Sequence, residues 1–99
     1  MGTERAVDVE NTRKDWGSRG FSCAVWTDPP GQVWRDYVHE ADELFMVLSG
    51  REELEMQGRV FRPAVGEELL IPARVTHTVR NVGGSVSRWL YGYKKPAGP

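Results

Sequence analysis

The sequence contains a single cysteine, almost no net charge and no long apolar run. Cys23 has no partner for an intramolecular disulfide, which fits a reducing compartment. The net charge of −1 leaves no basic excess and argues against nucleic acid or an anionic membrane as the main partner. No stretch approaches the ~20 apolar residues of a membrane span, and no apolar run follows the N-terminus as in a secretory signal. We therefore expect a cytoplasmic protein.

The sequence also lacks the pattern of long helices. Its 99 residues include 11 glycines and 6 prolines, and no window carries an apolar stripe at helical spacing over three turns. A chain of this length makes one domain, and short β-rich runs between turns predict an all-β sandwich or barrel. The expected strands cover residues 21–27, 32–39, 43–48, 53–57, 60–61, 68–71, 75–81 and 85–93.

The two ends of the chain differ from this β-rich part. Residues 1–20 are mostly polar, and we expect a loose arm or an edge strand there. Val7 and Val9 alternate with charged residues, which favours the strand. The predicted organisation is therefore an arm or edge strand at residues 1–20, a β-barrel at residues 21–93 and a frayed tail at residues 94–99.

Two of the expected strands are apolar on both faces. Residues 44–48 and 69–71 are hydrophobic at odd and even positions alike. A barrel wall turns only one face to its core, so something must cover the other face. A second copy of the chain is the simplest cover, and we predict a homodimer.

The chain has only two histidines, and both lie where a pocket would form. Tyr37 and His39 share one face of an extended strand, because side chains alternate with period two. Glu43 follows just past a tight corner, and His77 lies on a later strand. A single strand histidine is more often a core or surface residue than a ligand. Two imidazoles and a carboxylate from three strands, however, form a metal-binding set that leaves coordination positions open.

A pattern of residues that begins and ends with a glycine surrounds the first histidine. Gly31 precedes Tyr37-x-His39, Glu43 follows after three residues, and Gly50 follows after six more.

A second pattern surrounds the other histidine. Gly66 is followed by Pro72, then by Arg74, His77 and Asn81. Together the two patterns resemble the two motifs of the cupin superfamily, over roughly residues 31–91.

The sequence departs from these motifs at three positions. Gly31 comes two residues early, Tyr37 stands where the first histidine of the family belongs, and Arg74 replaces the second glycine of the second motif. The family glycine serves a turn or a close approach, so Arg74 must accept that backbone or reshape it.

The resemblance implies an antiparallel jelly-roll-like barrel with a divalent metal inside. It transfers ligand roles to His39, Glu43 and His77 but no such role to Tyr37. A phenol binds divalent metals poorly unless it is ionised, so Tyr37 is at most a weak ligand. It could also serve as an acid–base residue or as a core aromatic. We favour a hydrogen-bonding group beside the ligands or a part of the pocket wall. Nitrogen and oxygen ligands do not choose among iron, manganese, nickel and zinc.

Three further side chains are candidates for a substrate pocket. Arg74 either clamps an anionic substrate at the mouth or is a solvated loop residue. Trp89 and Tyr91 alternate on the last strand, where they line the pocket rim or pack in a core or interface.

Two function classes remain open at this stage. The first is a metal-dependent enzyme of dioxygenase, lyase or isomerase type that acts on a small molecule, with Tyr37 and Glu43 as candidate catalytic residues. The second is a module that binds or senses a small ligand without chemistry, with or without metal. Cupins occur in both classes, so the fold alone does not decide.

Overall fold

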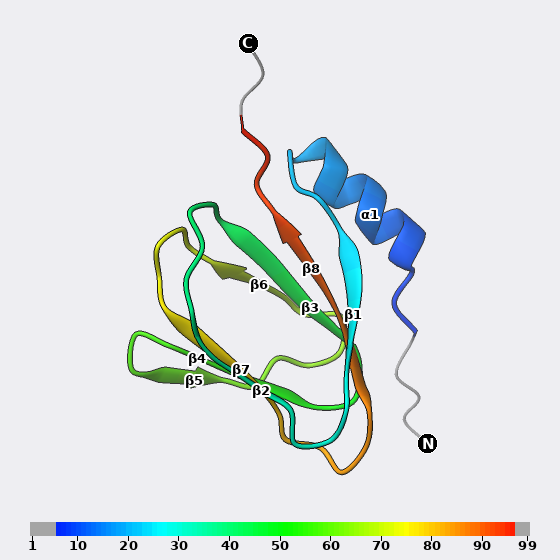
Figure 1. Ribbon diagram of the computed structural model, residues 1–99. Coiled ribbons are helices and arrows are strands. Elements are labelled where there is room, and N and C mark those ends of the chain that lie inside the picture. Colours follow the sequence, from blue (N-terminus) through cyan, green and yellow to red (C-terminus); the bar gives the residue numbers. More distant parts are fainter. Residues whose placement is uncertain (1–5, 97–99) are drawn as a thin grey trace.

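Eight short strands and one helix form residues 6–96, the part of the chain that the computed structural model describes, together with the turns that join them (Figure 1). Glycine-containing turns separate several of them: Gly50, between the third and fourth strands, has a φ of +85°, and a Cβ there would come within 2.8 Å of Ser87. The strands are β1 (Ala24–Asp28), β2 (Val33–Tyr37), β3 (Glu43–Ser49), β4 (Glu52–Met56), β5 (Arg59–Phe61), β6 (Glu68–Ile71), β7 (His77–Asn81) and β8 (Ser87–Tyr93).

The strands form two antiparallel sheets of four strands each. One sheet has the order β1-β8-β3-β6 and the other has the order β2-β7-β4-β5. The main core lies between them, because Phe45 and Trp89 from the first sheet pack with Leu54 and Val79 from the second. This arrangement confirms the predicted all-β antiparallel class and matches a cupin barrel, although the two sheets do not close on each other.

The N-terminal segment differs from the prediction. Residues Val9–Ser18 form helix α1, so a loose arm or an edge strand is wrong for this part of residues 1–20, and residues 1–5 lie outside the described residues. The Asp8 carboxylate accepts a hydrogen bond from the Asn11 N–H at 3.0 Å and caps the helix. Trp16 is fully buried, and this burial outweighs the two-residue alternation that favoured a strand. Among the described residues no helix is long and apolar enough to cross a membrane.

Helix α1 packs over one side of the first sheet (Figure 1). Trp16 forms a second core cluster with Leu44, Met46 and Leu90, side chains that point away from the main core. The second apolar face of β3, which we expected a second copy to cover, is therefore covered largely by the chain's own helix. Leu70 on β6 stays 50% exposed beyond it.

The start of the predicted C-terminal tail is held in place. Lys94 forms a β-bridge with Phe21, and its N–H donates to the Asp42 carbonyl at 2.8 Å. The Lys95 N–H donates to the Gly20 carbonyl at 2.8 Å. A frayed tail is thus wrong for these two residues, and residues 97–99 lie outside the described part of the chain.

Candidate metal centre and aromatic cavity

His39, Glu43 and His77, the three predicted ligands, come together between the sheets. Glu43 begins β3 in one sheet, His77 begins β7 in the other, and His39 follows β2. Tyr37 pairs with His77 across β2 and β7, which places the segment that carries His39 beside His77. The candidate ligand atoms of the three side chains all lie within 4.8 Å of one another.

The Glu43 carboxylate lies between the two imidazoles. Its Oε1 is 3.5 Å from Nε2 of His39 and 3.5 Å from Nε2 of His77. The residue is only 4% exposed, and burial raises the pKa of Glu43 to about 7. Among the described residues, Oε1 has no hydrogen-bond partner. A buried carboxylate oxygen without a donor is costly, and a cation beside it would offset that cost.

Both imidazoles direct Nε2 at the Glu43 carboxylate. Nδ1 of His77 lies 3.0 Å from the Val75 carbonyl, which only accepts, so Nδ1 carries a proton and Nε2 is the atom that faces Glu43. Burial lowers the pKa of His39, and the neighbouring His77 lowers it further. Two imidazole nitrogens beside an unpartnered carboxylate oxygen are a donor set that fits a divalent metal ion.

Tyr37, at the position of the family's first histidine, lies on the aromatic side of this group. Its ring stacks on His39 with the centroids 6.3 Å apart and packs edge-to-face on Trp34 at 6.0 Å. The side chain is 44% exposed and lines the same cavity as the three candidate ligands. This placement agrees with the favoured interpretation of Tyr37 as part of the pocket wall.

Tyr93 is a site residue that sequence reasoning missed. Its hydroxyl lies 3.3 Å from Nε2 of His39. Burial raises the pKa of Tyr93 to about 12, and the Glu43 and Tyr91 side chains add to the rise, so the phenol stays protonated near neutral pH. The signal was present, because Tyr93 continues the alternation of Trp89 and Tyr91 along β8.

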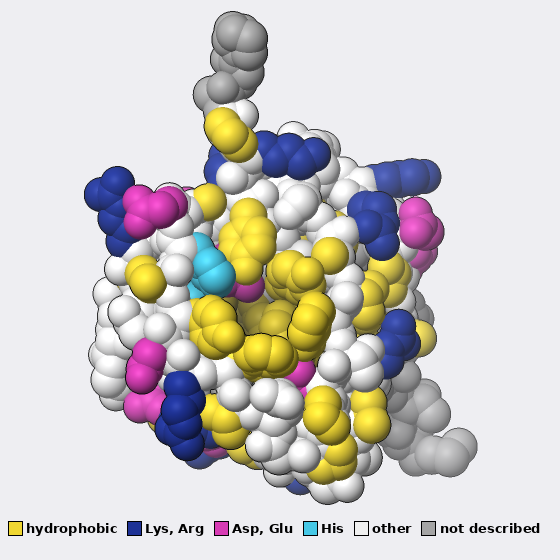
Figure 2. Space-filling model, in the orientation of Figure 1, with side chains coloured by type: hydrophobic (Ala, Val, Ile, Leu, Met, Phe, Trp, Pro, Cys, Tyr) yellow, Lys and Arg dark blue, Asp and Glu magenta, His cyan; other side chains and the backbone are white. Residues whose placement is uncertain are grey.

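A cavity of about 210 Å³ extends from the three candidate ligands. Figure 2 shows its opening, which hydrophobic side chains surround and where a histidine lies on the rim. The predicted pocket residues Trp89 and Tyr91 are in its wall. The full lining is Trp26, Trp34, Tyr37, His39, Glu43, His77, Val79, Trp89, Tyr91 and Tyr93.

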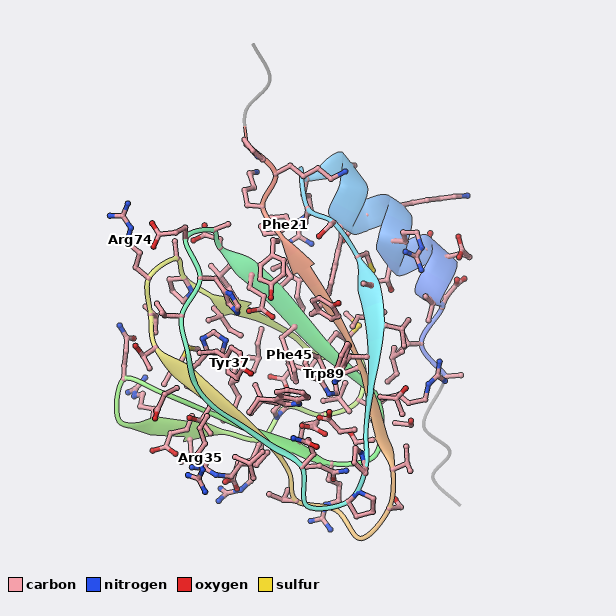
Figure 3. All side chains as sticks on the ribbon, in the orientation of Figure 1. Phe21, Arg35, Tyr37, Phe45, Arg74 and Trp89 are labelled. Atoms are coloured by element: carbon pink, nitrogen blue, oxygen red, sulfur yellow. The ribbon has the colours of Figure 1, made fainter. Side chains whose placement is uncertain are left out.

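Arg74, the third predicted pocket residue, lies outside this lining. Its Nε is 3.3 Å from Glu40 Oε1 on the surface, and Figure 3 shows the side chain turned away from the sheets. The backbone of Arg74 has a φ of +65°, so the arginine accepts the left-handed conformation that the family glycine would adopt easily. Of the two interpretations of Arg74, the clamp on an anion at the mouth and the solvated loop residue, this placement fits the second: the guanidinium pairs with the exposed carboxylate of Glu40.

A buried carboxylate fixes the tryptophans of the wall. Asp28 is fully buried, and its Oδ1 accepts hydrogen bonds from the indole N–H of Trp26 at 3.0 Å and of Trp34 at 2.9 Å. Its Oδ2 accepts from the indole N–H of Trp89 at 3.0 Å. The sequence suggested only that Asp28 opens a turn.

Comparisons with known proteins agree with this architecture. The family model described as Cupin domain matches residues 24–93. Over 63 residues the chain is 32% identical to the polyketide synthase CurC of Streptomyces cyaneus, a match that covers 63% of this chain and 41% of CurC. The chain thus spans less than half the length of this relative.

Solved structures share the fold. A predicted oxalate decarboxylase from Thermotoga maritima superposes with a TM-score of 0.69 at 19% identity, over 84% of this chain and 74% of that one. The DMSP lyase DddQ from Ruegeria pomeroyi superposes with a TM-score of 0.69 at 21% identity, over 81% of this chain and 41% of that one. At these identities the likeness concerns the fold alone.

Proposed function

Because this chain belongs to the cupin domain family, we propose that it is an enzyme that holds a divalent metal ion at His39, Glu43 and His77 and acts on a small molecule. The observation that carries the proposal is the unpartnered, buried Oε1 of Glu43 between two imidazole Nε2 atoms. Such an arrangement is costly for the protein alone and favourable around a cation.

The metal would supply Lewis acidity and open coordination positions for a substrate oxygen. The chain's own residues supply the rest: the two imidazoles and the carboxylate hold the ion, and the aromatic walls exclude water. The Tyr93 hydroxyl supplies a phenolic proton next to His39, and Tyr37 carries a second phenol on the wall of the same cavity. Tyr37 and Glu43 remain the candidate acid–base residues.

The reaction type is proposed as dioxygenase, lyase or isomerase, with iron, manganese, nickel or zinc as the ion. The structural neighbours described as a predicted oxalate decarboxylase and a DMSP lyase share only the fold and do not choose among these reaction types. The relative described as a polyketide synthase supports a role in building or modifying a carbon skeleton.

A second candidate is a module that binds a small ligand without chemistry. The mostly aromatic lining of the cavity favours it, because such walls retain an apolar ligand without a metal. The replacement of the family's first histidine by Tyr37 also favours it.

Metal analysis separates the two candidates. We would measure metal content per chain by mass spectrometry in the untagged wild type and in the His77→Ala and Glu43→Gln variants. The Glu55→Gln variant is the control, because it makes the same change on a half-exposed carboxylate that pairs with Arg80. We expect about one ion per chain in the wild type and the control, and a loss in both site variants. If the wild type and all three variants contain no metal and keep an intact circular dichroism spectrum, the binding module is favoured.

We also propose that the protein is cytoplasmic and that two copies associate. Helix α1 leaves Leu70 and Val25 of the first sheet at least one-third exposed, and these side chains would lie in the contact. Light scattering at micromolar concentration tests the association, and a monomer mass would refute it.

A further inference from the structure

We propose that the cavity binds a planar aromatic small molecule, whose ring lies against the wall of Trp26, Trp34 and Trp89 and whose oxygen donor points to the group of His39, Glu43 and His77. This inference deepens the proposed function and rests on it for the oxygen donor. The ring preference rests on the cavity wall alone.

The wall offers ring surfaces rather than hydrogen bonds. Asp28 accepts the indole N–H of all three tryptophans that line the cavity, so none of these donors is left for a ligand. The rings are also held at fixed angles to their neighbours. Trp26 packs edge-to-face on Trp34 at 5.7 Å and on Tyr91 at 6.3 Å. Preorganised π faces favour a flat, apolar partner.

The charged and metal-binding groups of the cavity belong to one group of side chains. His39, Glu43 and His77 lie together, and the Tyr93 hydroxyl joins them through His39. The remaining lining is aromatic apart from Val79, and among the described residues its only side-chain hydroxyls are those of Tyr37 and Tyr91. A matching ligand therefore has one polar, metal-binding part and an apolar remainder.

The same lining argues against a small dianion as the preferred ligand. None of the described residues that line the cavity is lysine or arginine. Arg74, the arginine that the sequence offered as a clamp at the mouth, is paired with Glu40 on the surface. An anion with two carboxylates would lose its hydration here and gain no cationic side chain in return.

The size of the cavity suits one or two rings. Its volume of about 210 Å³ exceeds the ~150 Å³ of an apolar cavity that holds benzene. Its opening at the surface lets substituents extend into solvent (Figure 2).

Calorimetric titration with naphthalene-2,3-diol tests the inference, and oxalate serves as the ring-free chelator. Both probes are titrated into metal-loaded and metal-free protein. The test variant is Trp34→Leu, and the matched control is Arg35→Leu, the next residue on β2, whose side chain lies outside the cavity (Figure 3). Trp26→Leu serves as a second test variant on another strand in case Trp34→Leu fails to fold.

We expect the diol to bind the metal-loaded wild type at least tenfold more tightly than oxalate. Loss of one wall tryptophan should weaken binding of the diol about tenfold in both metal states, a change of about 1.4 kcal/mol, because the diol loses an aromatic contact and the apolar area buried by it. The Arg35→Leu variant should bind as the wild type does. Oxalate binding tighter than the diol, or diol affinity unchanged in a folded tryptophan variant, would overturn the inference.

The metal-free arm separates this inference from the proposed function. If the protein carries no metal but still binds the diol through Trp34, the aromatic cavity stands and the metal enzyme fails. If the metal is present but the tryptophan variants bind the diol normally, the metal centre stands and the aromatic wall has no role in binding.

Discussion

Replacement of Glu52 by glutamine should make the protein more stable at neutral and alkaline pH. Glu52 begins β4 and is only 2% exposed, and among the described residues neither of its carboxylate oxygens has a hydrogen-bond partner. The nearby Ser87 hydroxyl is occupied, because it donates to the Ser49 carbonyl at 3.1 Å. Burial raises the pKa of Glu52 from 4.5 to about 7, and the Asp28 carboxylate adds to the rise.

The sign and the size of this stability change follow from the linkage between protonation of Glu52 and folding. An acid whose pKa is higher in the folded state binds its proton more tightly there, so folding is favoured while the acid is protonated. Stability is therefore lost as the pH rises from 4.5 to 7, and the loss is complete above that range. At ~1.4 kcal/mol per pKa unit, the rise costs about 3 kcal/mol of unfolding free energy above pH 7. A glutamine at this position keeps the shape and carries no charge at any pH.

Urea unfolding at pH 4.5 and at pH 8 measures this difference. The wild type and Glu52→Gln should have nearly equal unfolding free energies at pH 4.5, and at pH 8 the variant should be more stable by about 3 kcal/mol. Glu55→Gln on the same strand, whose carboxylate is half-exposed, is the control and should show no gain at pH 8. The contributions of other titrating groups, such as Glu43, to the unfolding free energy are the same in both proteins and cancel in the comparison. Equal pH dependence of the wild type and Glu52→Gln would refute the reasoning.

Three other substitutions test other parts of the structure. Gly92→Ala should destabilise the protein by about 3 kcal/mol or more in urea unfolding, because the new Cβ would lie 1.8 Å from the Ser22 carbonyl oxygen and 3.1 Å from Trp16. Arg74→Gly should raise the unfolding free energy by up to ~1 kcal/mol through relief of the positive φ, while the metal content stays unchanged. Asp28→Ala should lower stability by about 3 kcal/mol or more and change the tryptophan fluorescence, because three indole N–H groups lose their acceptor; a spectrum identical to the wild type would contradict the geometry.

The strands were predictable because their signals are local. Short apolar runs bounded by turn residues placed β3 at Glu43–Ser49 and β6 at Glu68–Ile71 within one residue of the prediction. The histidines were found for a related reason. Each belongs to a short pattern whose spacing is a property of the sequence, and the fold of the family then implies that the patterns meet.

The remaining features depend on contacts between distant segments. Helix α1 has a clear cap at Asp8, but the burial that holds it comes from Trp16 against β3 and β8, far along the chain. The role of Asp28 was not predictable for the same reason. Its three partners lie on three strands from two sheets, and no local pattern shows that their indoles point to one carboxylate.

The departure from the family motif at Tyr37 acquires a meaning only in this three-dimensional setting. In sequence it is a missing ligand. In the structure its ring lies between Trp34 and His39 and so continues the aromatic wall up to the candidate metal ligands. A histidine at this position would add a metal-binding nitrogen and present a smaller ring than the phenol that now lies there. The presence of tyrosine in place of histidine removes one metal-binding nitrogen and extends the aromatic surface of the wall. The exchange is thus consistent with a site that holds the ion by three side chains and uses the fourth position to recognise an aromatic small molecule.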